Sequence, residues 1–225
     1  AAPIKSTGTL AKNKPELIAA EFALNEGGGG RADKDGKLQT QGVQVGEKVV
    51  QQFRMETTNP GGHSSVPIRD NAIYQLAQAL LKVRDYEFPL QMNDTTRACF
   101  ERGGAGRTDA QGLAMVALSK NPGDKAAEAE LNKDRGFHSM LRTTCVATLL
   151  DGGHAENALP QRAGANINCR IFPGATMEAT KAALDAAIGD PGVTLTPLQP
   201  IRGKSMPAPL DPKILGPAEK IAAKY

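Results

Sequence analysis

The sequence predicts an α+β fold: a four-stranded antiparallel sheet with two helices on one face, in the split β-α-β order of ferredoxin-like domains. Two patterns predict it. From residue 43 onward, segments in which apolar and polar residues alternate, as in half-buried strands, are interleaved with segments whose apolar residues recur every three or four positions, as in helices. The resulting order is strand, helix, insertion, strand, strand, helix, strand. The second face of this sheet needs a partner or solvent.

The first strand is expected from Val43 to near Thr58, where apolar residues alternate with Gln, Lys, Arg and Glu. Residues 59–62 (Asn-Pro-Gly-Gly) have the composition of a turn. Asp70 is then expected to cap a helix that runs to about Val83.

The remaining elements follow the same two patterns. Residues 94–135 are rich in Ala, Gly, Asp and Lys and are predicted to form a mostly helical, exposed insertion. Strands are expected at 141–150 and 162–171, paired antiparallel. A helix from about 177 to 188 and a last strand at 193–198 complete the sheet.

Residues 1–42 are predicted to form a separate part of the chain. Residues 15–20 have helical composition, 21–24 form a short apolar strand, and 25–30 form a loop with four consecutive glycines. Those glycines suit either a close backbone approach or a flexible linker. Residues 30–36 contain two Asp residues but lack the oxygen spacing of a calcium loop, so they are expected to form a turn.

Composition excludes several classes of function. The chain of 225 residues carries a net charge of only +3, and its expected strands have almost no aromatic residues, which argues against nucleic acid binding. Its apolar runs are too short to span a membrane. The three cysteines Cys99, Cys145 and Cys169 show no disulfide or zinc-cluster spacing and are expected to be small buried thiols. The sequence leaves the compartment open.

Four residues stand out as candidates for chemistry. His63 lies on a tight loop between a strand and a helix, where it is either a hydrogen-bond donor to an oxyanion or a solvated loop histidine. Arg170, near the end of an apolar strand, is a carboxylate clamp or a structural salt-bridge partner. Asn157 lies in the preceding connection, so the sheet could bring the three together. Glu26 follows a short apolar strand and suits a zinc ion, although one carboxylate makes no site.

Four segments together resemble the aminoacylase and carboxypeptidase G metallopeptidases, peptidase family M20. They are Phe-Ala-Leu-Asn-Glu-Gly-Gly at 22–28, Asn-Pro-Gly-Gly-His-Ser-Ser at 59–65, the segment 153–160, and Asn-Cys-Arg-Ile-Phe-Pro-Gly at 168–174. Each is weak alone, but their common order makes the resemblance specific.

The resemblance implies a two-zinc enzyme that hydrolyses amide bonds of peptides or N-acyl amino acids, with a lid or dimerisation domain inserted in its catalytic domain. Glu26 then corresponds to a zinc ligand. His63 corresponds to the lid histidine that reaches a neighbouring subunit's active site and stabilises the tetrahedral intermediate. Asn157 and Arg170 correspond to the residues that hold the substrate's free carboxylate, and the lid is expected to form a homodimer.

The family's other metal ligands and its general base are missing from this sequence. No His is followed by Asp two residues later, no two Glu are adjacent, and no His follows His154. The chain alone is therefore expected to bind no zinc and to be inactive. The expected organisation is a catalytic-domain remnant at 1–42, the lid at 43–200 with its insertion at about 94–138, and the start of a return segment at 201–225.

Two other interpretations remain open. The chain could be a standalone interaction module that kept the fold without the chemistry. It could also be a self-sufficient enzyme whose metal site uses His63, His154 and Glu26, and bound metal would then be its signature.

Overall fold

The computed structural model describes residues 11–20, 28–32, 34–36, 38–206 and 209–224. They belong to two compact units, residues 1–44 and residues 45–225. Among the described residues, no helix is long and apolar enough to cross a membrane.

The first unit contains a short 3-10 helix, η1 (Pro15–Leu17), and a two-stranded antiparallel ladder. Strand β1 (Gly29–Ala32) pairs with β2 (Leu38–Gly42), and Gly29 lies opposite Gly42. The expected loop at 25–30 is therefore wrong at its end, because Gly29 and Gly30 belong to a strand. The expected strand at 21–24 and the candidate ligand Glu26 lie outside the described residues.

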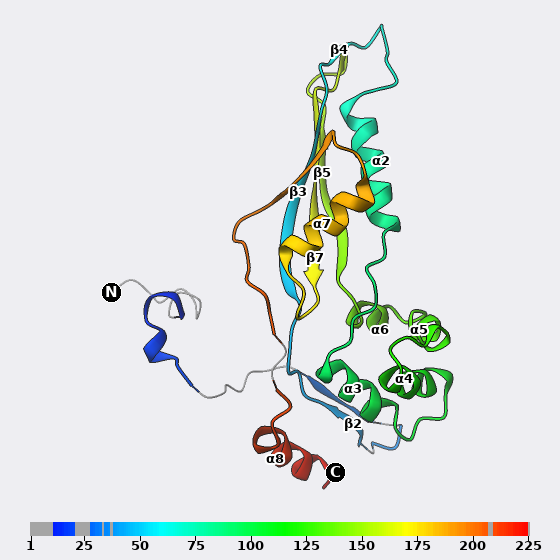
Figure 1. Cartoon of the computed structure of the whole chain (residues 1–225), viewed down its shortest axis with the longest axis vertical. Coiled ribbons are helices and arrows are strands. Elements are labelled where there is room, and N and C mark those ends of the chain that lie inside the picture. Colours follow the sequence, from blue (N-terminus) through cyan, green and yellow to red (C-terminus); the bar gives the residue numbers. More distant parts are fainter. Residues whose placement is uncertain (1–10, 21–27, 33, 37, 207–208, 225) are drawn as a thin grey trace. The chain divides into compact units, whose positions relative to one another are not determined.

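The second unit is built on a four-stranded antiparallel sheet. Its strands are β3 (Val49–Thr58), β5 (Thr144–Gly152), β7 (Arg162–Ile171) and β8 (Val193–Pro197), in the order β5-β7-β3-β8. Helix α2 (Ala72–Asp85) connects β3 to the insertion, and α7 (Met177–Ile188) connects β7 to β8 (Figure 1). This confirms the predicted ferredoxin-like α+β fold.

The core lies between the sheet and its two helices. Alternate residues of the two central strands, such as Phe53, Met55 and Ile167, are fully buried against Leu76 of α2 and Leu184 of α7. Burial of such side chains contributes about 1.5–3 kcal/mol each. Period-two burial on β3 therefore fixes which face of the sheet the helices cover.

The other face of the sheet carries charge. Arg54 of β3 reaches across β7 and forms a bidentate ion pair with Asp151 of β5, at 2.5 and 2.8 Å. It passes over Gly164, where an added Cβ would lie 2.1 Å from the Arg54 guanidinium. Glu56 also pairs with Arg162. Because it carries these ion pairs, this face of the sheet can be exposed to water.

The starts of three elements differ from those predicted, each for an identifiable reason. Strand β3 begins at Val49, not Val43, because its partner β7 ends at Ile171, directly opposite Val49. The cap of α2 is Asn71, not Asp70: the Asn71 side chain accepts a hydrogen bond from the Tyr74 backbone N–H at 3.1 Å. Strand β5 begins at Thr144 and not at residue 141, because Leu141 is buried in the insertion.

The insertion is helical, as predicted, but it has its own core. It comprises α3 (Asp94–Gly104), α4 (Ala110–Lys120), α5 (Lys125–Leu131) and α6 (Arg135–Met140). An Asn or Asp side chain caps the start of each helix. Phe100, Leu118, Leu131 and Leu141 are fully buried together. The expectation of an exposed insertion is therefore wrong.

A buried arginine joins this insertion to the sheet. Arg142, just before β5, is 1% exposed and pairs with Glu87, which follows α2, and with Glu128 of α5 at 2.9 Å. Its Nε makes no hydrogen bond among the described residues. Buried charges are stable only when paired, so both carboxylates are needed here.

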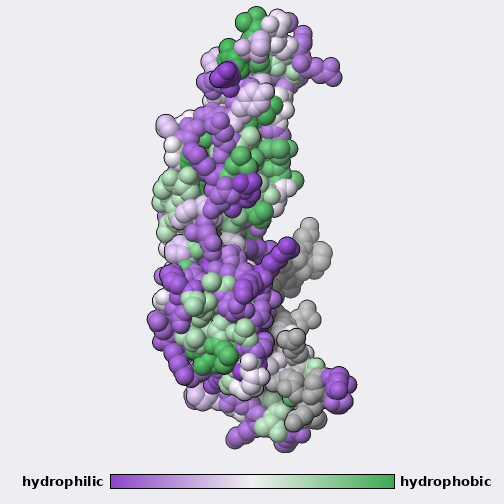
Figure 2. Space-filling model, turned by 90° about the vertical axis from the view of Figure 1, so that its right-hand side faces the viewer, coloured by the Kyte–Doolittle hydropathy of each residue, from purple (hydrophilic) through white to green (hydrophobic). Residues whose placement is uncertain are grey.

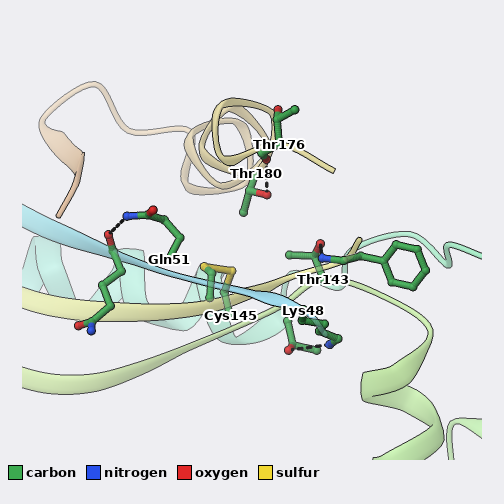
Figure 3. The surroundings of a disulfide bond; sticks show 10 residues. Lys48, Gln51, Thr143, Cys145, Thr176 and Thr180 are labelled. Atoms are coloured by element: carbon green, nitrogen blue, oxygen red, sulfur yellow. Dashed lines mark hydrogen bonds between the residues drawn. A yellow bond between two sulfur atoms is a disulfide. The ribbon is translucent and has the colours of Figure 1, made fainter. Parts of the chain in front are cut away.

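The prediction of small buried thiols is wrong for each of the three cysteines. Cys145 of β5 and Cys169 of β7 lie directly opposite each other and form a disulfide beneath α7 (Figure 3). The spacing of the cysteines in the sequence does not predict this disulfide. The two sulfur atoms meet only because of the register in which β5 pairs with β7. Cys99 of α3 is a free thiol, but its side chain is exposed and not buried; partial desolvation raises its pKa.

The C-terminal helix α8 (Pro212–Ala222) begins with an Asp211 cap, whose side chain accepts from the Lys213 N–H at 2.8 Å. Glu219 pairs with Arg102 of α3 at 2.7 Å. This contact ties α8 to the insertion.

Candidate functional site

His63 and Asn157 lie beside each other on a small two-stranded ladder beyond the end of the main sheet. Strand β4 (Gly62–His63) pairs antiparallel with β6 (Ala158–Leu159), and His63 lies opposite Ala158. The Ser64 N–H also donates to the Asn157 carbonyl at 3.0 Å. The backbone therefore holds the two residues together independently of their side chains.

The turn that leads into this ladder requires its sequence. The Asn59 side chain accepts from the Gly61 N–H at 3.1 Å, and its amide donates to the Asp70 carbonyl at 3.3 Å. Gly61 has φ +80°, and an added Cβ would lie 2.6 Å from Cγ of Gln161. Only glycine fits this position without strain, which explains the Gly residues before His63.

The His63 ring is exposed and is held through one of its nitrogens. Nδ1 lies 2.7 Å from the Ser65 hydroxyl and 3.2 Å from the Ser65 backbone nitrogen. The Val66 N–H also donates to the His63 carbonyl at 3.0 Å, which closes the turn. Nε2 makes no hydrogen bond among the described residues.

Asn157 is exposed, and within the described chain its side-chain amide makes no hydrogen bond. An amide can both donate to and accept from a ligand. Asn157 and Nε2 of His63 therefore provide polar groups at this end that are not used within the described fold.

Arg170 lies near the opposite end of β7. It is exposed, it faces Val50 on β3 and Thr144 on β5, and no described carboxylate pairs with it. Lys48 donates to the Thr144 hydroxyl at 3.3 Å. Burial first, then the charges of Arg170 and Arg142, lower the pKa of Lys48 to about 8. This end of the sheet is therefore positively charged and suits an anionic group.

The sheet separates Arg170 from the other two candidates. Thr58, which leads into the His63 turn, pairs with Arg162, whereas Arg170 pairs with Val50, eight residues further along. At about 3.4 Å per residue this places the two ends roughly 27 Å apart. The expectation that one chain brings all three residues together is therefore wrong for Arg170.

The structure brings no metal site together in the described part of the chain. No group of three or more His, Cys, Asp or Glu side chains there could hold a metal ion. His138 instead contacts Asn132 at 3.2 Å and Arg142 at 2.7 Å, and burial followed by the Arg142 charge lowers its pKa. The described residues thus do not fit a zinc ion, and the role of Glu26 stays a prediction.

An apolar surface runs along β5 and the neighbouring part of α2. Leu150 of β5 is 70% exposed beside Ile73 and Leu80 of α2, with which it lines a shallow hollow. Leu149 and Val146 of β5 are also exposed, but they lie opposite Asn166 and Asn168 of β7 and therefore on the other face of the sheet from α2. Figure 2, which shows the side that carries α2, has hydrophobic patches between polar ones. The outer edge of β5 pairs with no other described strand, so this surface suits a partner.

Sequence reasoning assigned no functional role to Lys48 or to the residues of this apolar surface. Lys48 could have been found from the alternation, which places it on the same side of the chain as Val50. Leu149 and Leu150 could not, because a bulge between Ala147 and Leu149 shifts the register of β5.

The fold and these features define an α+β domain whose open edge strand and apolar helix face suit pairing with a partner. The chain belongs to the peptidase dimerisation domain family of the M20 peptidases, whose pattern it matches over residues 45–195.

Two curated relatives share this region. The probable carboxypeptidase S-like 2 of Dictyostelium discoideum is 29% identical over 132 residues, which cover 59% of this chain and 25% of the relative. The N-fatty-acyl-amino acid synthase/hydrolase PM20D1.1 of Danio rerio is 24% identical over 149 residues, 66% of this chain and 28% of the relative. The chain thus spans about a quarter of the length of these relatives.

Among solved structures, an M20 family metallo-carboxypeptidase from Sulfolobus solfataricus aligns with a TM-score of 0.41 at 15% identity, over 68% of this chain and 45% of that one. Human carnosine dipeptidase 1 aligns with a TM-score of 0.44 at 13% identity, over 81% of this chain and 44% of that one.

Proposed function

We propose that this chain is the lid and dimerisation part of a zinc-dependent metallopeptidase or amidohydrolase that cleaves amide bonds of peptides or N-acyl amino acids. The family membership supports a hydrolase of the M20 class. The names of the two curated relatives, a carboxypeptidase and an N-fatty-acyl-amino acid hydrolase, support the substrate class.

The observation that carries the proposal is the separation of the two polar ends of the sheet. His63 and Asn157 lie at one end and Arg170 lies at the other, roughly 27 Å away. A substrate the size of a dipeptide cannot contact both ends of one chain. A two-fold pairing of two chains would bring the His63 end of one towards the Arg170 end of its partner.

The exposed edge supports the same pairing. In a homodimer, α2 and the outer edge of β5 would lie against their own copies, which would bury Leu150 and Ile73 and satisfy the edge backbone groups. Each active site would then contain residues of both subunits.

The proposed roles follow from the chemistry of each side chain. His63 donates a hydrogen bond to the oxyanion that forms when water attacks the amide carbonyl. Arg170 binds the substrate's free carboxylate through its planar fork, and Asn157 donates to the same ligand. Bound zinc would supply an activated water, but the described residues do not fit a zinc ion.

The proposal assigns residues 1–42 to a catalytic-domain remnant that carries the zinc ligand Glu26, residues 43–200 to the lid, and residues 201–225 to the start of the return to the catalytic domain. On this assignment the chain alone is inactive, because the other ligands and the general base are elsewhere.

Mixed dimers test the shared site. In the longer protein that the proposal requires, His63→Ala and Arg170→Ala should each lower kcat/KM by about 10²–10³ for an N-acyl amino acid. When the two inactive variants are unfolded, mixed and refolded together, half of the dimers should be heterodimers with one intact site. Activity should then return to about a quarter of the wild-type value.

If His63 and Arg170 acted within the same subunit, every mixed dimer would lack an intact site and no activity would return. That result would overturn the shared site. A chain that stays monomeric at high concentration would overturn the predicted self-association.

A further inference from the structure

The contacts of His63 determine which of its ring nitrogens carries the proton. The Ser65 backbone nitrogen lies 3.2 Å from Nδ1 with its N–H directed at the ring nitrogen. A backbone N–H can donate but cannot accept a hydrogen bond. Nδ1 must therefore be the acceptor and carries no proton in this arrangement.

The Ser65 hydroxyl makes a second contact with the same atom. It lies 2.7 Å from Nδ1, and because Nδ1 has no proton to give, the hydroxyl is the donor. Nδ1 thus accepts two hydrogen bonds from Ser65, one from its backbone N–H and one from its hydroxyl. A neutral imidazole has one protonated nitrogen, so the proton of His63 is on Nε2.

We propose that Ser65 is a positioning residue that holds His63 in the Nε2–H tautomer and thereby presents a hydrogen-bond donor, not a proton acceptor, at the exposed side of the ring. The tautomer rests on the Ser65 contacts alone. Its use as a donor to the oxyanion rests on the proposed function. In this tautomer Nε2 has no free lone pair, so neutral His63 cannot act there as a general base.

The backbone around the ring supports a fixed orientation. Ser64 donates to the Asn157 carbonyl and Val66 donates to the His63 carbonyl, both at 3.0 Å. The residues on both sides of Ser65 are therefore held, and the Ser65 N–H cannot turn away from Nδ1 without breaking one of these bonds.

The first test measures the tautomer on this chain. With ¹⁵N-labelled protein above about pH 8, where imidazoles are neutral, the two-bond and three-bond correlations of each ring distinguish Nε2–H from Nδ1–H. His154, an exposed loop histidine with no hydrogen bond among the described residues, is the internal control. His63→Asn and His154→Asn variants assign the signals.

His63 should show a pyridine-type Nδ1 and a protonated Nε2 more completely than His154. Ser65→Ala removes the hydroxyl but keeps the backbone N–H, so it should shift the His63 signals only part of the way towards those of His154, whereas Ser65→Thr should retain them. The inference is overturned if His63 carries its proton on Nδ1, or if its signals match those of His154 and do not respond to Ser65→Ala.

The second test separates this inference from the proposed function. In the longer dimeric enzyme, Ser65→Ala should lower kcat about tenfold with little change in KM, since one donor of an oxyanion site is worth about 10²–10³ and here it is misplaced but not lost. Ser65→Thr should restore kcat. If His63→Ala leaves kcat unchanged, the oxyanion role fails while the tautomer result stands. If His63→Ala abolishes activity but Ser65→Ala changes neither kcat nor the spectrum, the positioning role fails.

Discussion

Replacing Lys48 with methionine should stabilise the folded chain at neutral pH, and this gain should disappear in alkali. Lys48 is partly buried on the charged side of the sheet, where its ammonium lies near Arg170 and Arg142 and donates to the Thr144 hydroxyl. Methionine has a similar length and shape without the charge. The variant therefore removes the repulsion and the desolvation while it keeps most of the packing.

The direction of the pH dependence follows from the lowered pKa. Below about pH 8, Lys48 is charged in both the folded and the unfolded chain, so folding carries the full penalty of holding that charge. Between about 8 and its usual value of 10.5, the unfolded chain binds a proton that the folded chain has lost, and stability rises with pH. Above 10.5 the amine is neutral in both states and the penalty is gone.

The expected size comes from the same values. The fall of the pKa from 10.5 to about 8 corresponds to at most about 3.4 kcal/mol. Because the amine is only partly buried, solvent screening reduces this to about 1–2 kcal/mol. The lost hydrogen bond to Thr144 offsets about 0.5–1 kcal/mol of the gain. Lys48→Met should therefore be about 1 kcal/mol more stable than wild type near pH 7 and slightly less stable above pH 10.5.

Urea unfolding at a fixed protein concentration, followed by circular dichroism between about pH 7 and 10.5, measures this difference. Lys204→Met, at an exposed lysine of the same unit, controls for general effects of alkali. The reasoning is refuted if the difference between Lys48→Met and wild type is independent of pH, or if the variant is the less stable protein at pH 7.

Two further predictions concern the apolar surface and the insertion. Leu150→Glu on the edge strand should shift the chain from dimer to monomer in sedimentation equilibrium. The control variant Leu113→Glu, at a similarly exposed leucine of the insertion, should not. Equal effects of both variants would argue against pairing through β5. Arg142→Ala should destabilise the chain by about 3 kcal/mol because it removes a fully buried side chain and its ion pairs with Glu87 and Glu128, although Glu128 keeps Lys125 as a partner at 2.9 Å. It should also expose residues 94–140 to limited proteolysis, and unchanged protection would show that the ion pairs do not hold the insertion.

The regular part of the fold could be predicted because each element carries a clear period. The bounds of β7 and α7 follow directly from alternation at 162–171 and from helical spacing at 177–188. The start of β3 could not be found this way, because the alternation continues upstream of Val49 and only the end of the partner strand at Ile171 stops the pairing. Local pattern thus predicts what a segment can form, while partner length decides how much of it forms.

The disulfide illustrates a second limit. Both Cys145 and Cys169 were expected on strands that pair, so their proximity depended on register alone. The connection between these strands contains the β6 ladder, and β5 has a bulge between Ala147 and Leu149. Neither the β6 ladder nor the bulge has a sequence signal that shows how many residues it contains. The register between β5 and β7 could therefore not be predicted from the sequence.

More of the geometry of the candidate site could have been predicted from the sequence. His63 follows the end of β3, and Asn157 precedes the start of β7, so antiparallel pairing of these strands brings the two residues to one end. Arg170 lies thirteen positions after Asn157, most of them in one extended strand. A strand of ten residues cannot fold back on itself, so the separation of Arg170 was already implied.

This separation gives the sheet a mechanical role in the proposed enzyme. The distance between the His63 end and the Arg170 end is set by ten paired residues of β3 and β7, a ladder that backbone hydrogen bonds hold along its whole length. The ion pair between Arg54 and Asp151 crosses this ladder and links it to β5, the strand proposed to pair with the partner subunit. A shared site needs the two ends at a constant spacing, because an oxyanion donor displaced by about 1 Å can lose about 10²-fold in rate. The sheet would therefore act as a rigid spacer between two half-sites, each of which would be completed by the partner subunit.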